Sequence, residues 1–381
     1  MTLAIAAPSF SQPSETFIRA HVRTISYDET VLLCQDGRGA EELGRSVLSN
    51  LDPYSQPQSV VEKIWNSLRF RWKKKYNRSL AGINEQRVHE FFIQHKVTHC
   101  LAEFGPTGCL LHRVAKNANV RFFVHFHGYD ATSLPRDKAW RQHYIKMFRD
   151  AEGIIAPSSF ILDRLVALGC PRDKMYVSSC GINPSDFVES QRQAGMVLAI
   201  GRFVEKKAPL STIKAFAKVA SLEPHAQLHM VGDGPLLKEA HNLALTLDLS
   251  DRIVFHGSQS HDAVQLLLRK AAVFVQHSVT ASNGDTEGLP VAILEAMASS
   301  LPVVSTRHSG IPDVVSDGVT GFLVDEHDIT GMANNIIYLL QYPELAASMG
   351  QAGAPRIKNQ YSHAATAARL RKIMGINNNA S

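Results

Sequence analysis

The sequence predicts an α/β protein built from two doubly wound domains, and three observations support this prediction. The chain has 381 residues, which is more than one ordinary hydrophobic core accommodates. Short apolar runs alternate with helix-length segments along almost the whole chain, as in strand–helix repeats. The runs are mostly continuous rather than alternating in polarity, as expected for parallel strands that helices cover on both faces.

Twelve apolar runs are expected to form strands. The first six are 3–7, 31–34, 98–102, 122–126, 153–156 and 175–178, and the second six are 197–200, 227–231, 253–256, 273–276, 302–305 and 322–324. Helices are expected between them, including 209–220, 235–247, 261–270 and 290–299.

The polar stretch from Glu189 to Gly195 lacks apolar periodicity and separates the two sets of strands. We therefore expect an N-terminal Rossmann-like domain at residues 1–190 and a C-terminal one at 191–360, facing each other across a cleft. Residues 361–381 are expected to form a helix that crosses back to the N-terminal domain, followed by a frayed tail. Ligands of such folds bind at strand carboxyl ends and between domains.

Composition narrows the classes of function. An apolar content of 45% and a charged content of 20% are ordinary for a soluble protein, and the net charge of +5 is mild. No apolar run approaches the roughly 18–20 residues of a membrane span. The segment Thr2–Pro8 lacks a basic region before its apolar residues, so we expect a strand rather than a signal peptide. Five scattered cysteines without a C-x-x-C fit a reducing cytoplasm and argue against structural zinc.

The central motif runs from Glu287 to Ala298. Pro290 suits the first helical position, which would place Glu287 just before the helix and Glu295 about a turn and a half inside it. The free amides of a helix N-terminus bind phosphate, and the two carboxylates can accept hydrogen bonds from sugar and ribose hydroxyls. An ordinary helix with an acidic flank is the alternative, and the motif alone does not separate the two.

A basic loop follows the apolar run 197–200, at the carboxyl end of an expected strand. Its Arg202 and Lys207 can hold a diphosphate and neutralise the charge that grows as it leaves. The alternative is a solvated basic loop. The nearby Gly232-Asp233-Gly234-Pro235 lacks the third glycine of a dinucleotide fingerprint, so we interpret it as a tight strand–helix turn rather than a dehydrogenase motif.

His125-Phe126-His127-Gly128-Tyr129-Asp130 follows another expected strand. A histidine at this position can contact a sugar near its reacting carbon. A structural histidine is one alternative, and metal binding is another, because H-x-H is a ligand spacing in some metalloenzymes. No accompanying histidine or carboxylate motif supports the metal, and no D-x-D triplet is present to hold a metal-bridged diphosphate. No metal or other cofactor is therefore expected.

A basic and aromatic stretch extends from Lys63 to Arg78, with no acidic residue before Asn84. Trp65, Leu68, Trp72 and Tyr76 recur at helical spacing, which suits docking on an anionic membrane surface. The expected docking residues are Trp65, Arg69, Arg71, Trp72, Lys73, Lys74 and Lys75. The alternatives are a helix packed on its own domain and a nucleic-acid site, and no base-reading motif supports nucleic acid.

Together these motifs resemble family 4 of the retaining glycosyltransferases, which have the GT-B fold. The resemblance covers nearly the whole chain and is strongest in the C-terminal half. It rests on Gly201-Arg202 with Lys207, the turn 231–235, Phe255-His256-Gly257, the E-x7-E spacing of Glu287 and Glu295, and the segments 301–304, 310–312 and 318–322. Ala208 departs from the family, many members of which have glycine after the lysine.

The resemblance implies a role for each matching residue. Arg202 and Lys207 would hold the donor diphosphate, Glu287 would face the donor sugar and Glu295 the ribose. Gly201 and the amides of Gly288, Leu289 and Val291 would complete the donor site. His127 would lie near the donor sugar, and the acceptor side would be formed by Ser14, Glu15, Thr16, Glu103 and Gly105.

The expected function is transfer of a hexose from a UDP- or GDP-sugar to a hydroxyl of a glycan or lipid-linked acceptor, with retention of configuration and without a metal. The resemblance points to envelope or exopolysaccharide biosynthesis at the inner face of the cytoplasmic membrane. Two alternatives are a nucleotide-sugar epimerase of the same fold and a catalytically silent nucleotide-sugar-binding protein.

Overall fold

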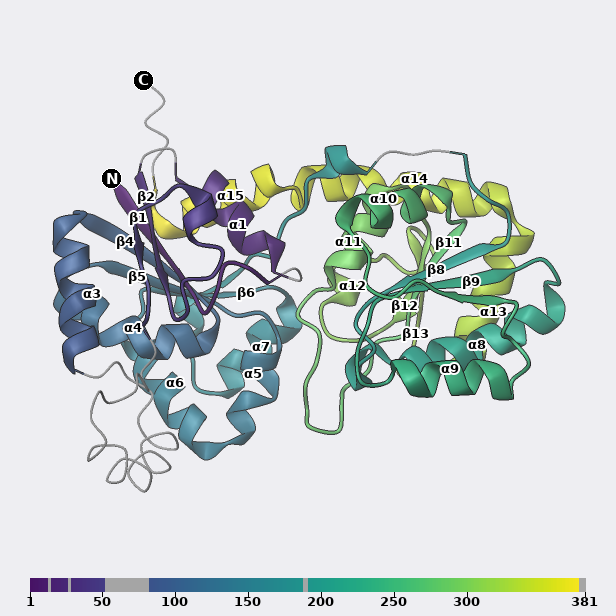
Figure 1. Cartoon of the computed structure of the whole chain (residues 1–381), viewed down its shortest axis with the longest axis horizontal. Helices are drawn as coiled ribbons and strands as arrows, with labels where there is room; N and C mark the ends of the chain where they lie inside the picture. Colours follow the sequence, from purple (N-terminus) through teal and green to yellow (C-terminus); the bar gives the residue numbers. More distant parts are fainter. Residues whose placement is uncertain (13–14, 27–28, 52–81, 188–190, 377–381) are drawn as a thin grey trace. The chain divides into compact units, whose positions relative to one another are not determined.

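The computed structural model describes residues 1–12, 15–26, 29–51, 82–187 and 191–376. The chain forms two compact units, one made of Met1–Ser179 with Thr366–Ser381 and the other of Cys180–Ala365. Each unit is an α/β domain with its own parallel sheet, and each is described by itself below (Figure 1).

The N-terminal unit contains a seven-stranded sheet in the order β3-β2-β1-β4-β5-β6-β7, in which all neighbours are parallel. All six strands predicted in this half are present. The seventh, β3, was missed because two residues are too few to show a pattern. The strands are β1 (Thr2–Ala7), β2 (Glu29–Cys34), β3 (Val47–Leu48), β4 (Val97–Glu103), β5 (Arg121–His125), β6 (Gly153–Ala156) and β7 (Met175–Val177).

Helices cover both faces of this sheet. One buried core combines alternate strand residues such as Ala4 and Ala6 with helices α3, α4, α6 and α7. Helices α1 and α15 lie next to each other in Figure 1, and the Arg371 guanidinium of α15 donates to the Thr24 carbonyl at 2.7 Å. The helices are α1 (Thr16–Thr24), α3 (Gly82–Gln94), α4 (Gly105–Asn117), α5 (Tyr129–Thr132), α6 (Lys138–Asp150), α7 (Ser159–Ala167) and α15 (His363–Met374).

The C-terminal unit contains a six-stranded parallel sheet in the order β10-β9-β8-β11-β12-β13. All six predicted strands are present. They are β8 (Met196–Ile200), β9 (Gln227–Val231), β10 (Ile253–Phe255), β11 (Val273–Gln276), β12 (Val303–Thr306) and β13 (Gly321–Val324).

Two helical layers sandwich this second sheet (Figure 1). Val197 and Ala199 of β8 face a core shared with α8, α9 and α13, whereas Met196 and Leu198 face a core shared with α10, α11 and α12. Burial on both faces explains the continuous apolar runs of the sequence. The helices are α8 (Pro209–Leu222), α9 (Leu237–Thr246), α10 (His261–Lys270), α11 (Val291–Ala298), α12 (Ile311–Val314), α13 (Ile329–Gln341) and α14 (Pro343–Gln360).

The strand order reverses between β1 and β4 in one sheet and between β8 and β11 in the other. The carboxyl ends of strands at such switch points are where doubly wound folds bind ligands. The prediction of two Rossmann-like domains is confirmed. Their arrangement across a cleft stays a prediction.

Two helix boundaries differ from the sequence prediction. Pro290 precedes α11 as its N-cap with an extended backbone (φ −66°, ψ 117°) rather than occupying the first helical position. The last helix begins at His363 instead of residue 361, because α14 continues to Gln360.

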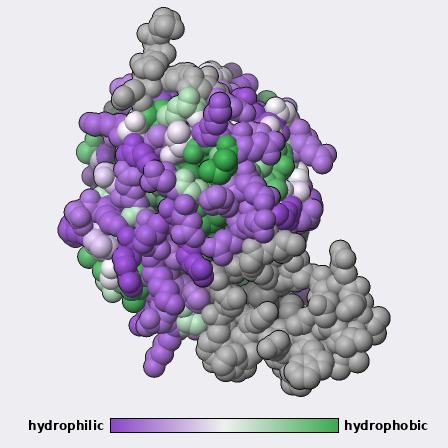
Figure 2. Space-filling view, turned by 90° about the vertical axis from the view of Figure 1, so that its left-hand side faces the viewer, coloured by the Kyte–Doolittle hydropathy of each residue, from purple (hydrophilic) through white to green (hydrophobic). Residues whose placement is uncertain are grey.

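The face of the N-terminal side shown in Figure 2 is mostly hydrophilic, with a few separate hydrophobic areas. Such scattered apolar residues are normal on a protein surface. Within the described part of the chain, no helix has both the length and the apolar character needed to cross a bilayer.

Candidate functional site

A pocket in the C-terminal unit lies at the carboxyl ends of three neighbouring strands, β8, β9 and β11. Arg202 is exposed at this pocket, and Lys207 is half-buried in it. The pocket is therefore basic and sits beside the switch point of the sheet. Its lining consists of residues 199–203, Lys207, Pro209, Thr212, Met230, Val231, Val275 and Gln276.

Gly232 allows the loop after β8 to approach the loop after β9. Its φ is +136°, and a Cβ atom there would lie 2.0 Å from the Gly201 carbonyl oxygen. The Phe203 amide donates to the Asp233 carbonyl at 2.9 Å, and the Gly201 amide donates to Val231 at 2.9 Å. The segment 232–235 is thus a tight turn that supports the Arg202 loop, in agreement with the strand–helix turn expected from the sequence.

Ala208 occupies the position where the resembling family often has glycine, and its backbone is left-handed (φ 39°, ψ 53°). For alanine this conformation costs about 1 kcal/mol, which explains why glycine suits the position. The loop adopts the turn without glycine: Ala208 is the N-cap of α8, and its carbonyl accepts from the Ser211 amide at 3.0 Å. Lys207 is held directly before this turn.

The pocket cation Lys207 is paired with Glu287. The Lys207 Nζ lies 3.1 Å from Glu287 Oε2, and both side chains are largely buried. Burial raises the pKa of Glu287, but Lys207 and Lys206 outweigh burial and leave the pKa below its usual value. Burial lowers the pKa of Lys207, and Glu287 opposes that shift. The two predicted residues, 80 positions apart in the sequence numbering, form one charged unit.

Lys206 is a site residue that the sequence did not reveal. Its buried Nζ lies 3.1 Å from Asp285 Oδ1, 3.2 Å from the Thr286 carbonyl oxygen and 4.0 Å from Glu287 Oε1. Lys206 therefore ties the segment before Glu287 to the basic loop. The signal in the sequence is the Lys206-Lys207 pair, but adjacency does not say which lysine points into the pocket and which points into the loop.

The backbone of Glu287 is fixed from a second direction by the loop after β12. The Glu287 amide donates to His308 Nε2 at 3.1 Å, and His308 Nδ1 lies 2.6 Å from Glu326 Oε1. His308 therefore carries a proton on Nδ1 and donates a hydrogen bond to the Glu326 carboxylate. The Ser309 hydroxyl donates to the Glu287 carbonyl oxygen. None of these three supports was predicted, since their contacts with Glu287 are purely tertiary.

Glu295 lies on α11, in the same motif but in a different electrostatic setting. It is half-buried, and burial raises its pKa to about 7. Gly288, Leu289 and Val291 lie between the two carboxylates, with Val291 as the first residue of the helix. One carboxylate of the E-x7-E motif is thus held ionised, whereas the other titrates near neutral pH.

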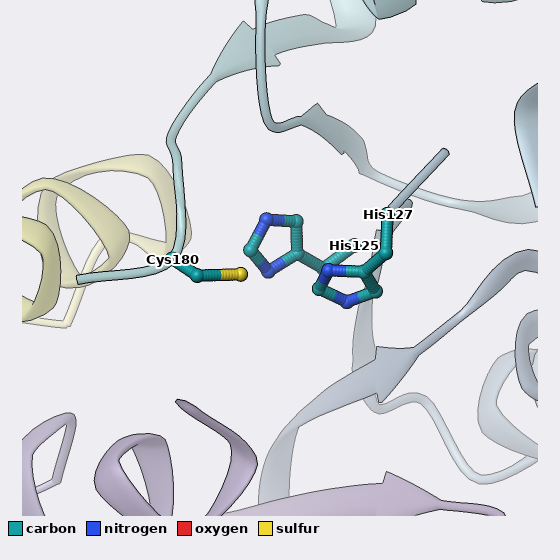
Figure 3. A group of neighbouring side chains, drawn as sticks. All are labelled: His125, His127 and Cys180. Atoms are coloured by element: carbon teal, nitrogen blue, oxygen red, sulfur yellow. The ribbon is translucent and has the colours of Figure 1, made fainter. Parts of the chain in front are cut away.

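In the N-terminal unit, the predicted residues Glu103 and His127 are in direct contact. Glu103 ends β4 and is fully buried, and its Oε2 lies 2.8 Å from His127 Nε2 and 3.4 Å from His125 Nδ1. Its Oε1 lies 2.6 Å from Nδ1 of His21 on α1. Figure 3 shows the rings of His125 and His127 side by side, with centroids 4.4 Å apart. The sequence showed no companion to H-x-H, whereas the fold supplies a histidine and a carboxylate.

Asp130 organises the same loop and was also not predicted as a site residue. Its buried carboxylate accepts hydrogen bonds from the amides of His127, Gly128 and Gly105 at 2.9, 3.0 and 2.9 Å. A Cβ on Gly105 would lie 2.4 Å from the Phe126 ring, so this position requires glycine. Gly105 thus contributes through its backbone and through close packing.

The remaining predicted residues fall into two groups. Thr16 is the first residue of α1, the helix that carries His21, and Glu15 is the N-cap of this helix. Ser14 lies outside the described residues. The predicted membrane-docking residues also lie outside them, namely Trp65, Arg69, Arg71, Trp72, Lys73, Lys74 and Lys75.

We predict that Glu287→Gln lowers the free energy of unfolding by about 3 kcal/mol, because it leaves the buried Lys207 ammonium without its counter-ion. Urea unfolding of both proteins at neutral pH measures the difference. The double variant Lys207→Met/Glu287→Gln should lose less than the sum of the two single variants. Additive losses would show that the pair does not interact.

Comparisons with known proteins agree with this architecture. The family model "Glycosyl transferases group 1" matches residues 186–356, and the model "Glycosyltransferase Family 4" matches residues 28–186. WcaL of Salmonella typhimurium, named for colanic acid biosynthesis, is 31% identical over 281 residues, which are 71% of this chain and 67% of WcaL. The amylovoran biosynthesis glycosyltransferase AmsK of Erwinia amylovora is 30% identical over 247 residues, 63% of this chain and 61% of AmsK.

Solved structures show the same fold. The crystal structure of Anabaena HepE in complex with UDP superposes with a TM-score of 0.80 at 18% identity, covering 98% of this chain and 100% of HepE. Sucrose-phosphate synthase of Thermosynechococcus elongatus superposes with a TM-score of 0.74 at 17% identity, covering 98% of each chain. The fold of this protein is therefore that of GT-B enzymes.

Proposed function

Because the chain belongs to the group 1 and family 4 glycosyltransferases, we propose that it transfers a hexose from a UDP- or GDP-sugar to a hydroxyl of a glycan or lipid-linked acceptor, retaining the anomeric configuration. The observation that carries the proposal is the basic pocket at the ends of β8, β9 and β11, where Arg202 and Lys207 adjoin Glu287. Two cations beside one ionised carboxylate suit a diphosphate next to a hydroxylated sugar.

The names of relatives support the substrate classes. The HepE structure holds UDP, which favours a nucleotide donor for the same fold. WcaL and AmsK are named for colanic acid and amylovoran biosynthesis. We extend this to the present chain as a role in envelope or exopolysaccharide biosynthesis, with a glycan or lipid-linked acceptor.

The proposed mechanism is mainly electrostatic. Arg202 and Lys207 stabilise the negative charge that develops on the departing diphosphate, together with amides at the start of α11. The leaving phosphate takes the proton of the acceptor hydroxyl on the same face of the sugar. Glu287 is ionised and paired with Lys207, so it accepts hydrogen bonds from sugar hydroxyls rather than acting as an acid. Protein cations supply the positive charge in this mechanism, which therefore needs no metal.

We predict that Arg202→Ala and Lys207→Ala each reduce kcat by about 100-fold or more, since each removes a charge that stabilises the leaving group. The measurement is release of free UDP or GDP from a panel of nucleotide sugars, with and without a lipid-linked acceptor. Lys218→Ala on the exposed surface of α8 is the matched control and should retain full activity.

The same assay separates the proposal from the two alternatives. Acceptor-dependent release of the nucleoside diphosphate supports transfer. An isomerised sugar formed without acceptor would instead indicate an epimerase, and binding without turnover would indicate a silent protein. Near-normal activity in both variants would overturn the assignment of the phosphate clamp.

We predict that donor affinity increases as the pH rises through about 7, because ionised Glu295 accepts ribose hydroxyls better than the protonated acid does. Below this pH the protonated form of Glu295 prevails, and the carboxylate that accepts hydrogen bonds from the ribose hydroxyls is lost. Calorimetric titration of the donor between pH 5.5 and 8.5 measures the effect (roughly tenfold per pKa unit at most). Glu295→Gln should bind with little pH dependence, and a wild-type affinity that is flat across the range would contradict the ribose assignment.

Membrane docking through the basic stretch of residues 63–78 is a further part of the proposal, and it would bring the enzyme to a lipid-linked acceptor. We predict that the protein sediments with vesicles containing anionic lipid and less with neutral vesicles. Replacing Lys73, Lys74 and Lys75 by Gln should weaken this by several-fold. Equal binding of the triple variant and the wild type would remove the argument for docking.

A further inference from the structure

We infer that Glu103 is a positioning residue that fixes the tautomer and orientation of His127. The second oxygen of the Glu103 carboxylate is held by the buried His21. The inference rests on the proposed function, together with the position near the donor sugar that the family resemblance implies for His127. The residues that position His127 are Glu103 at the end of β4 and His21 on α1, which lie outside the His125–Asp130 motif in the sequence.

The geometry assigns one Glu103 oxygen to each of two imidazoles. Oε1 lies 2.6 Å from His21 Nδ1, and Oε2 lies 2.8 Å from His127 Nε2. An ionised carboxylate only accepts hydrogen bonds, so both nitrogens must carry protons. A neutral His127 is then protonated on Nε2, and its Nδ1 is the acceptor nitrogen. The carboxylate thus decides which chemistry His127 offers a sugar hydroxyl.

The charge of Glu103 is compensated by imidazoles. Its side chain is fully buried, and its ion pairs among the described residues are with His21, His125 and His127. Burial raises the pKa of Glu103, but the charge of His21 and hydrogen bonds from the histidines hold it well below its usual value. A buried carboxylate ion is stabilised by the hydrogen bonds that it accepts. The contacts of Glu103 with His21 and His127 therefore hold its charge inside the domain.

His125 is the third imidazole beside the carboxylate. Its Nε2 lies 2.9 Å from the Ser178 carbonyl oxygen, so this nitrogen is a donor. Its Nδ1 faces Glu103 Oε2 at 3.4 Å without a hydrogen bond in the structure. The shorter contacts of the Glu103 oxygens are therefore those with His21 and His127.

Other contacts hold His127 in the same orientation. The Phe17 and Phe104 rings lie 4.5 and 4.6 Å from its ring, and Asp130 accepts from its amide. Phe104 has a strained backbone (φ 72°, ψ 141°), and such strain persists where surrounding structure enforces a functional geometry. The titratable groups that face His127 are therefore Glu103 from β4, His125 from β5 and Asp130 from α5, whereas His21 from α1 faces Glu103.

The test is Glu103→Gln. An amide offers one oxygen and one NH2 group, so it can accept from only one of the two imidazoles. We expect His127 to lose its Nε2–H tautomer, which imidazole ¹⁵N chemical shifts report directly. We also expect kcat to fall at least tenfold with the donor KM changed less than threefold. Burial lowers the pKa of His127, and Glu103 opposes that shift, so removing the carboxylate should move the acidic limb of the kcat profile to still lower pH.

The matched control is Asp150→Asn, which alters another carboxylate–imidazole pair of the same unit. His112 Nδ1 lies 2.7 Å from Asp150 Oδ2, between α4 and α6. This variant should lose stability without changing the His127 tautomer or the pH profile. If Glu103→Gln does not fold, the wild-type spectrum still decides, because His127 protonated on Nδ1 would overturn the inference.

The outcomes also separate this inference from the proposed function. A tautomer change without any sugar transfer by the wild type would support the positioning and reject the function. Sugar transfer by the wild type, together with an unchanged His127 tautomer, kcat and pH profile in Glu103→Gln, would support the proposed function and reject the positioning role of Glu103. Stoichiometric zinc in the purified wild type, lost in Glu103→Gln, would place a metal ion between Glu103 and the histidines, in place of the proton on His127 Nε2. That result would overturn the inference as well.

Discussion

The candidate donor site depends on one buried pair of opposite charges, Lys207 and Glu287. Burial disfavours each charge, and the partner in the pair opposes that effect on both sides. The pair also joins two loops that leave different strands of the sheet. Lys206 and His308 then hold the backbone around Glu287 from both sides. The site is therefore preorganised by the protein before any ligand is present, which is what electrostatic catalysis requires.

Each of the two domains contains a buried carboxylate, and different basic side chains stabilise its negative charge in each. Glu287 is compensated by lysines, a residue type whose ordinary pKa lies far above neutral pH, whereas Glu103 is compensated by histidines. A lysine partner makes the carboxylate a constant acceptor. A histidine partner makes the cluster hold a proton whose position follows the hydrogen bonds around it. The choice of partner thus suits one site for holding a permanent diphosphate charge and the other for setting the state of a single imidazole.

The sequence predicted the parts of the fold that depend on local pattern. All twelve strands were found, because continuous apolar runs mark strands that are covered on both faces. The two-residue strand Val47–Leu48 was missed, since its existence depends on pairing with β2. Pro290 was placed one position too far into the helix, because proline suits both the N-cap and the first turn.

The candidate site was predictable only where its residues form motifs. Arg202, Lys207 and Glu287 stood out by spacing and by position at strand ends. Lys206 did not, because its role follows from contacts with Asp285 and Thr286 across the fold. The surroundings of His127 were misjudged for the same reason. The sequence shows no histidine or carboxylate motif next to His127, whereas the sheet brings Glu103 beside it from an adjacent strand.

The E-x7-E spacing shows why the structure adds more than a list of residues. Glu287 and Glu295 belong to one motif, yet their pKa values shift in opposite directions. Both side chains lose water on folding, so burial alone would raise both values. Among the described residues, lysines lie near Glu287 and reverse the shift, whereas burial is the cause that raises the pKa of Glu295. The two carboxylates are therefore not an acid–base pair acting on one bond. One is a fixed negative group beside the diphosphate clamp, and the other is a titrating acceptor whose ionisation a hydroxyl-bearing ligand would favour.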